Sequence, residues 1–186
     1  MNHRYLISAA LLLCLAATPA FAGDAPEKAK GPSDKEQIQK ALKAGPASIT
    51  AHAAVKDMNG KVLRPGTNGW SCYAEPEQMC LDAVWEGWMQ AYMTKGPFKA
   101  AKIGTAYMLA GDNGTSNTDP FATAPTADNH WVHEGPHIMI LFPDPAMLEA
   151  FSSDENNGGP YIMWKGTPYA HVMMPVGKRP SDKKKM

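Results

Sequence analysis

The longest regular pattern of apolar positions lies between residues 76 and 94. Apolar side chains recur there at the three- and four-residue spacing that places them on one face of a helix, namely Leu81, Val84, Trp85, Trp88, Met89, Tyr92 and Met93. Pro76 suits the first turn of a helix, and Gly96 followed by Pro97 suits its end. The pattern predicts one long helix over 76–94, with Trp85 and Trp88 in the core.

Shorter segments have the alternation, or the β-branched and aromatic content, that is typical of strands. We expect strands at 48–55, 61–63, 70–73, 103–110, 137–142, 161–164 and 169–176, and short helices at 37–44 and 144–151. Asn59-Gly60 and the segment 165–168 predict hairpin turns. Because helices and strands do not alternate regularly, the predicted fold class is α+β: a mainly antiparallel sheet of five to seven strands, packed on one long helix and rich in loops.

Residues 1–22 have the pattern of a secretory signal peptide. Arg4 precedes a short apolar run, and Ala20-Phe21-Ala22 fits an A-x-A cleavage site. The run is too short for a comfortable membrane span, so we expect a secreted protein, in a bacterial periplasm, with no membrane anchor after the signal is cleaved. A retained membrane anchor is the alternative.

The rest of the chain is predicted to form one domain. We expect a flexible leader at 23–45 that can hold a short helix, a single globular domain at 46–176 and a basic tail at 177–186. The 18 Lys and Arg residues balance 18 Asp and Glu residues, so the chain lacks the basic excess that binds nucleic acid. With 44% hydrophobic residues it is too apolar for wholesale disorder. Any specific function therefore has to come from a local cluster of side chains.

Signal cleavage removes one of the three cysteines and leaves Cys72 and Cys80. Two cysteines in an oxidising compartment are expected to pair, and this disulfide closes a small loop worth about 2.5 kcal/mol in the chain-entropy model. The alternative is that both are thiolate ligands of a metal.

The stretch from His130 to His137 places three histidines and Glu134 within a short segment. Its letters H-E-G-P-H, from His133 to His137, satisfy the H-E-x-x-H pattern of zinc proteases, which requires a helix. Gly135 and Pro136 oppose a helix at this position, because proline inside a helix costs about 3 kcal/mol. The letters therefore match the zinc-protease pattern, but the segment is not expected to form the helix that the pattern requires. For this reason zinc is only the alternative metal.

A different pattern involves two predicted strands that each carry His and then Met two residues later. His137 and Met139 share one face of the first strand, and His171 and Met173 share one face of the second. The opposite faces are fully apolar and suited to packing on the helix. If the strands are neighbours, the imidazoles and thioethers form a ligand set for copper. The two H-x-M elements resemble the ligand patterns of secreted copper carriers, which implies copper binding or delivery.

The first hypothesis is thus a copper site of His137, His171, Met139 and Met173, with His133 and Glu134 as accessory ligands and His130 nearby. In a second hypothesis the protein is a small-molecule binder or an enzyme. The loop 111–129 is then a lid, Glu134 is the candidate general acid or base, and His133, His137 and His171 supply acid/base groups or hold zinc. In a third, it is an envelope structural or interaction protein without metal, and the methionines fill an apolar layer beside hydrogen-bonded histidines.

Overall fold

The computed structural model describes residues 31–180, so the predicted signal peptide lies outside the described residues. The helices are α1 (Asp34–Ala41), α2 (Ala47–Thr50), α3 (Ala83–Met93) and the 3-10 helix η1 (Pro145–Ala150). The strands are β1 (Ala54–Lys56), β2 (Val62–Arg64), β3 (Ser71–Tyr73), β4 (Met79–Leu81), β5 (Gly104–Met108), β6 (Thr115–Ser116), β7 (Trp131–Val132), β8 (His137–Leu141), β9 (Tyr161–Met163) and β10 (His171–Pro175). None of the helices within residues 31–180 has the length and apolar character that a membrane span requires.

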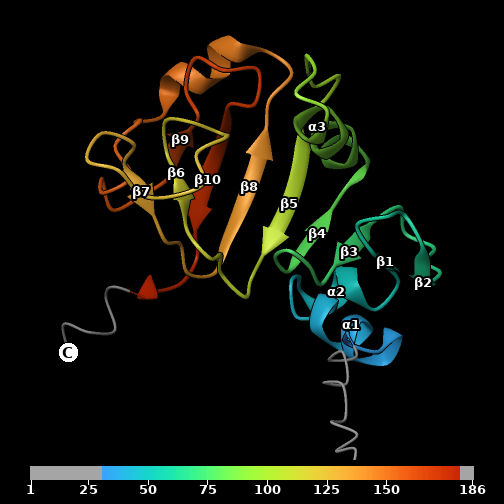
Figure 1. Ribbon diagram of the computed structural model, residues 1–186. Helices are drawn as coiled ribbons and strands as arrows, with labels where there is room; N and C mark the ends of the chain where they lie inside the picture. The colour runs from blue at the N-terminus through green and yellow to red at the C-terminus, as the bar shows by residue number, and fades with distance from the viewer. Residues whose placement is uncertain (1–30, 181–186) are drawn as a thin grey trace, which may run out of the picture. The chain divides into compact units, whose positions relative to one another are not determined.

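Eight strands form one sheet in the order β2-β1-β3-β4-β5-β8-β10-β9, and β6 and β7 form a separate antiparallel pair. Within the large sheet all neighbours are antiparallel except β1 and β3, which are parallel. Figure 1 shows β4, β5 and β8 side by side, with α3 beside one end of β5. The predicted class, a mixed fold with a large and mostly antiparallel sheet, is confirmed. The strand count was too low, because β4 adds an eighth strand to this sheet.

The predicted helix over 76–94 is wrong in its first part. Residues 79–81 form β4, which pairs with β3 on one side and with β5 on the other. The helix begins only at Ala83, because Asp82 caps it by accepting hydrogen bonds from the backbone N–H groups of Val84 and Trp85 at 2.9 and 3.0 Å. The second carboxylate oxygen of Asp82 accepts from the N–H of Thr105 at 2.7 Å, which ties the start of α3 to β5.

The predicted strand over 48–55 is also wrong in its first part. Residues 47–50 form the short helix α2 after Pro46, and only residues 54–56 form a strand. The hairpin predicted at Asn59-Gly60 is present, since β1 and β2 pair antiparallel around it. Gly60 has a φ of 83°, a left-handed conformation that glycine adopts without strain.

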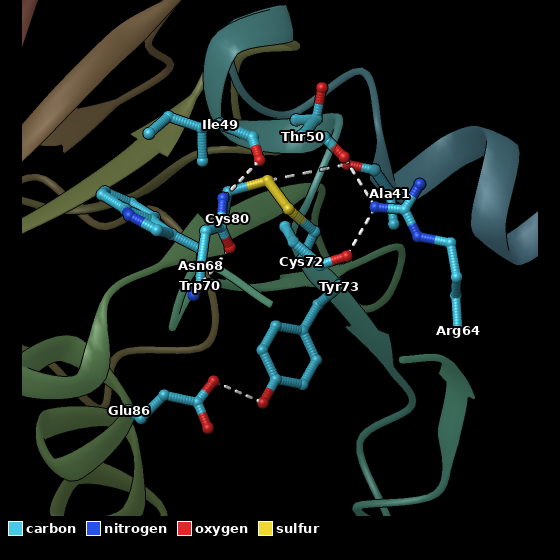
Figure 2. The surroundings of a disulfide bond; sticks show 11 residues. Ala41, Ile49, Thr50, Arg64, Asn68, Trp70, Cys72, Tyr73, Cys80 and Glu86 are labelled. Atoms are coloured by element: carbon cyan, nitrogen blue, oxygen red, sulfur yellow. Dashed lines mark hydrogen bonds between the residues drawn. A yellow bond between two sulfur atoms is a disulfide. The ribbon is translucent and has the colours of Figure 1, made fainter. Parts of the chain in front are cut away.

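The disulfide between Cys72 and Cys80 is present, as predicted, and joins directly opposed residues of β3 and β4. Figure 2 shows it on one side of the sheet with Ala41, while Tyr73 points to the other side, toward Glu86 of α3. The hydroxyl of Tyr73 donates a hydrogen bond of 2.7 Å to that carboxylate. The sheet therefore has a core on each face, one with the disulfide and α1 and the other, larger one with α3.

Candidate functional site

A cavity of about 330 Å³ lies on the α3 side of the sheet. Its walls come from α3, from β4, β5, β8, β9 and β10, and from the loops around residues 76 and 112. Eight of the twelve methionines of the chain line it, namely Met58, Met79, Met89, Met93, Met108, Met139, Met163 and Met173. Two thirds of the methionines of the chain are thus concentrated at one place.

The two H-x-M strands are neighbours in the sheet and turn their His and Met side chains into this cavity. β8 and β10 pair antiparallel with Met139 directly opposite Met173. Both histidines and both methionines are buried and line the cavity. The prediction that the other, fully apolar faces pack on the helix is wrong, since it is His171 that contacts α3, with its ring centroid 5.2 Å from that of Trp85. Alternation assigns side chains to two faces but does not tell which face lies inside.

Both buried histidines have the same hydrogen-bonding arrangement. Nδ1 of His137 lies 2.8 Å from the carbonyl oxygen of Gly135, and Nδ1 of His171 lies 2.9 Å from that of Tyr169. A carbonyl only accepts, so each Nδ1 carries the proton and donates it. Each Nε2 then bears a lone pair, and neither Nε2 has a hydrogen-bond partner although both are buried. A ring oriented through Nδ1, with a free Nε2, is the arrangement that metal-binding histidines have.

Burial keeps both imidazoles uncharged near neutral pH. Loss of solvation lowers the pKa of His171 to about 4, against the weaker opposing effect of the hydrogen bond to Tyr169. Burial also lowers the pKa of His137, while the Gly135 carbonyl and the negative charge of Glu134 act in the opposite direction. The uncharged form is the one whose nitrogen can bind a metal ion.

Two further methionines lie next to the histidines. On the sheet, Met108 of β5 is directly opposite His137, and Met163 of β9 is directly opposite His171. Opposed residues of neighbouring strands have their Cβ atoms about 5 Å apart, so these side chains are in reach of each other. Sequence reasoning missed both methionines. Both methionines lie in segments predicted as strands, at 103–110 and 161–164. The sequence did not show, however, which of these strands are neighbours of the His-Met strands in the sheet.

Aromatic rings surround His171. The ring centroids of Trp85, Trp88 and Trp164 lie 5.2, 5.7 and 5.1 Å from that of the imidazole, all close to perpendicular to it. The indole nitrogens of Trp88 and Trp164 donate to backbone carbonyls, whereas Nε1 of Trp85 is buried without a partner. Trp85 and Trp88 are part of the core, as predicted, and they also form a wall of the cavity.

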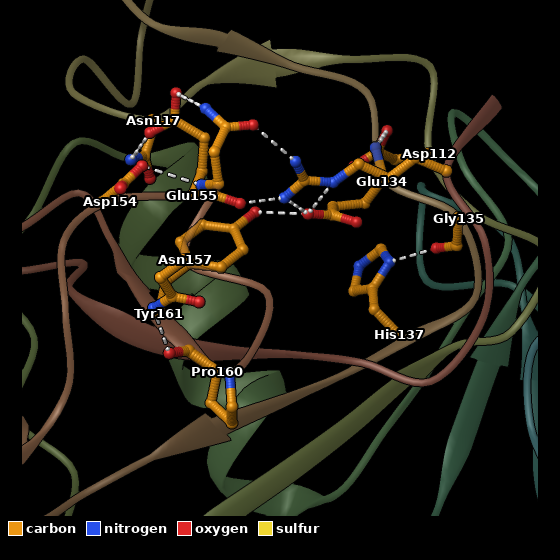
Figure 3. Close-up of polar contacts among 12 residues, drawn as sticks. Asp112, Asn117, Glu134, Gly135, His137, Asp154, Glu155, Asn157, Pro160 and Tyr161 are labelled. Atoms are coloured by element: carbon orange, nitrogen blue, oxygen red, sulfur yellow. Dashed lines mark hydrogen bonds and ion pairs between the residues drawn. The ribbon is translucent and has the colours of Figure 1, made fainter. Parts of the chain in front are cut away.

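Glu134 belongs to a polar cluster beside this cavity. Its carboxylate is fully buried, and its Oε1 accepts from Nε and Nη2 of Arg179 at 2.9 and 2.5 Å and from the hydroxyl of Tyr161 at 2.9 Å. Its Oε2 has no partner. Figure 3 shows the Glu134 carboxylate between the hydroxyl of Tyr161 and the ring of His137. Arg179, which lies in the segment assigned to the basic tail, is thereby tied to the domain.

The other histidines of this segment are not brought into the cavity. His133 and His130 are exposed, and Nδ1 of His130 lies 3.5 Å from a carboxylate oxygen of Glu155. The H-E-x-x-H letters do not lie on a helix, since His137 opens β8 and residues 133–136 precede it as irregular chain. Within residues 31–180, no group of three or more His, Cys, Asp or Glu side chains is placed to hold a metal ion.

The long loop predicted at 111–129 forms one wall of the cavity through Asp112 and Thr115. Asp112 accepts hydrogen bonds from the N–H groups of Gly114 and Glu134, yet burial raises the pKa of its carboxyl to about 7. Residues 115–116 of the loop pair with β7 as β6. The hydroxyl of Tyr92, on α3, donates to the carbonyl of Pro120 and fastens the loop to the helix.

A comparison of the chain with protein-family models, with curated protein sequences and with solved structures gave no significant match.

Proposed function

We propose that the protein binds monovalent copper in the methionine-lined cavity, as a carrier or buffer of the metal. The observation that carries the proposal is the pair of uncharged histidines with unpartnered Nε2 atoms, in a cavity that eight methionines also line. Thioether sulfur is a soft ligand that selects Cu(I), and imidazole suits copper as well. The principal ligands are His137, His171, Met139 and Met173.

Glu134 and His133 are proposed as accessory ligands, and the position of Glu134 supports its role better than that of His133 does. Glu134 keeps one carboxylate oxygen without a hydrogen-bond partner, and its charge acts on His137. It can therefore supply negative charge beside a cation. His133 is exposed to solvent, so a ligand role for it requires a movement of the segment before β8.

The proposed location is outside the cytoplasm, in a bacterial periplasm. The Cys72–Cys80 disulfide supports it, because such bonds persist in oxidising compartments. The signal peptide proposed for residues 1–22 supports it from the sequence. A carrier of Cu(I) in such a compartment has to shield the ion from oxidation, and the burial of the four principal ligands supports such shielding.

The test is a competition titration of the purified protein with Cu(I) and a chromophoric Cu(I) chelator, under reducing and anaerobic conditions. We expect the wild type to take copper from the chelator and the double variant His137→Ala/His171→Ala to lose at least tenfold in affinity. His52→Ala is the matched control, because His52 is exposed in a turn, and it should bind like the wild type. Unchanged affinity in the double variant would show that the proposed site is wrong.

A second candidate function is binding of a small apolar molecule in the same cavity. The observation that favours it is the aromatic wall of Trp85, Trp88, Tyr92 and Trp164, together with a volume of about 330 Å³ within the usual range of ligand pockets. In that case the protein takes up no copper in the titration. It binds an environment-sensitive apolar dye instead, and Ala106→Leu abolishes this binding. Ala106 is buried and lies directly opposite the cavity residue Met139, so a larger side chain there should push into the cavity.

A further inference from the structure

We infer that the cavity holds two separate Cu(I) sites, one at each histidine, and not one site that both histidines share. The inference rests on the proposed function, and it gives that function a stoichiometry of two ions per chain. It follows from the register of the strands and from the different surroundings of His137 and His171.

The register keeps the two histidines apart. His137 is directly opposite Pro175, which lies four residues along β10 from His171. Four residues of strand span about 13 Å. Side chains stand roughly perpendicular to a sheet, so the rings begin at this separation. Two nitrogens bound to one ion by bonds of about 2 Å lie at most about 4 Å apart. One shared ion would require both rings to lean far along the sheet.

The hydrogen bonds of the rings oppose such leaning. The Nδ1 atom of His137 is bonded to the carbonyl of Gly135, two residues before it and in the direction away from Met139. The Nδ1 atom of His171 is bonded in the same way to Tyr169, away from Met173. These bonds fix the orientation of each ring at its own end of the cavity.

Each histidine has its own pair of methionines. The first site consists of His137, of Met139 two residues along the same strand, and of Met108 directly opposite on β5. The second consists of His171, of Met173 two residues along its strand, and of Met163 directly opposite on β9. One imidazole and two thioethers form a complete soft ligand set at either end.

The two sites differ in their neighbours, which makes them distinguishable. The site at His171 is surrounded by Trp85, Trp88 and Trp164, with ring centroids within 5.7 Å of the imidazole. A cation bound there lies close to indole faces and interacts with them. The site at His137 lies beside the carboxylate of Glu134, whose charge acts on that ring. Only the site at His171 should therefore change tryptophan fluorescence strongly.

The experiment is a stoichiometric titration of the purified protein with Cu(I), repeated with Ag(I) as a monovalent probe that does not change oxidation state, with tryptophan fluorescence recorded at each addition. We expect two equivalents in the wild type. His137→Ala should bind one equivalent and keep the fluorescence quenching, and His171→Ala should bind one equivalent and lose most of it. His52→Ala, at an exposed position, should behave like the wild type.

A second set of variants guards against misfolding of the histidine variants. Met108→Leu/Met139→Leu removes the thioethers of one site and Met163→Leu/Met173→Leu those of the other, while side-chain volume is nearly conserved. Each pair should weaken one equivalent at least tenfold and leave the other. Met147→Leu, at a site 43% exposed outside the cavity, is the control.

The possible results separate the two proposals. One equivalent in the wild type that either histidine variant abolishes would overturn the two-site inference and retain the proposed function, with a single shared ion. No binding by the wild type above the level of the double histidine variant would overturn both. Two equivalents that none of the cavity variants affects would place the ions elsewhere and also overturn both.

Discussion

The ion pair between Glu134 and Arg179 allows a quantitative prediction for the substitution Arg179→Gln. Glu134 is fully buried, and its hydrogen bonds come from the guanidinium and from the hydroxyl of Tyr161. The guanidinium side chain is 19% exposed, so water only partly screens the pair. The substitution removes the cation and leaves a buried carboxylate with one hydrogen-bond donor.

Two estimates give the expected size of the loss in the free energy of unfolding of Arg179→Gln. Removing one partner of a buried ion pair typically costs about 3–5 kcal/mol. A carboxylate without its cation can instead take up a proton. For an ordinary glutamate this costs about 1.36 kcal/mol for every pH unit above about 4.3, or roughly 3.7 kcal/mol at pH 7. We therefore expect a loss of about 3 kcal/mol in the free energy of unfolding at pH 7, falling to about 1 kcal/mol at pH 5.

The assay is urea denaturation at pH 5 and pH 7, followed by tryptophan fluorescence. Glu134→Gln is the matched control, since its neutral amide can keep the bond to Tyr161 while Arg179 retains its contacts to Asn156 and to the backbone of Glu155. It should lose less stability than Arg179→Gln at pH 7. The difference in its loss between the two pH values should also be smaller. A loss below about 1 kcal/mol for Arg179→Gln at pH 7, or an equal loss at both pH values, would refute the reasoning.

Three further predictions concern stability. Replacing Cys72 and Cys80 by serine should cost about 2.5 kcal/mol, seen in calorimetry as a Tm lower by roughly 5–10 °C, and an unchanged Tm would contradict it. Gly104→Ala should cost about 1–3 kcal/mol by the same measurement, since an added Cβ would lie 2.8 Å from Cβ of Val84. Because the folded-state pKa of Asp112 is raised, its ionisation destabilises the fold as pH rises from about 4 toward 7. Asp112→Asn should therefore gain stability over the wild type at pH 8 in urea denaturation, and a gain that persists at pH 4 would argue against this cause.

Local sequence patterns predicted most of the helices and strands. They did not predict the boundaries where one segment has the pattern of a helix but part of it forms a strand. Residues 84–93, which have helical spacing of apolar side chains, do lie in a helix. The same spacing extends toward the N-terminus to Leu81, but Leu81 lies in β4. A helical pattern contains no information on whether a segment has a strand partner on each side. β4 has two such partners, and the bond between Cys72 and Cys80 joins it to one of them.

The sequence by itself determined which residues carry the candidate chemistry: alternation placed His137 with Met139 and His171 with Met173, since strand geometry has a period of two. It also predicted the disulfide, because two cysteines in a chain expected to be exported should pair in an oxidising compartment. Only the tertiary structure decided that these faces lie inside, beneath α3, and which residues of β5 and β9 stand beside them. Strand order and register are set by contacts between segments distant in the sequence, so no local pattern records them. The same register separates the two histidines along the sheet and sets each one among methionines of its own.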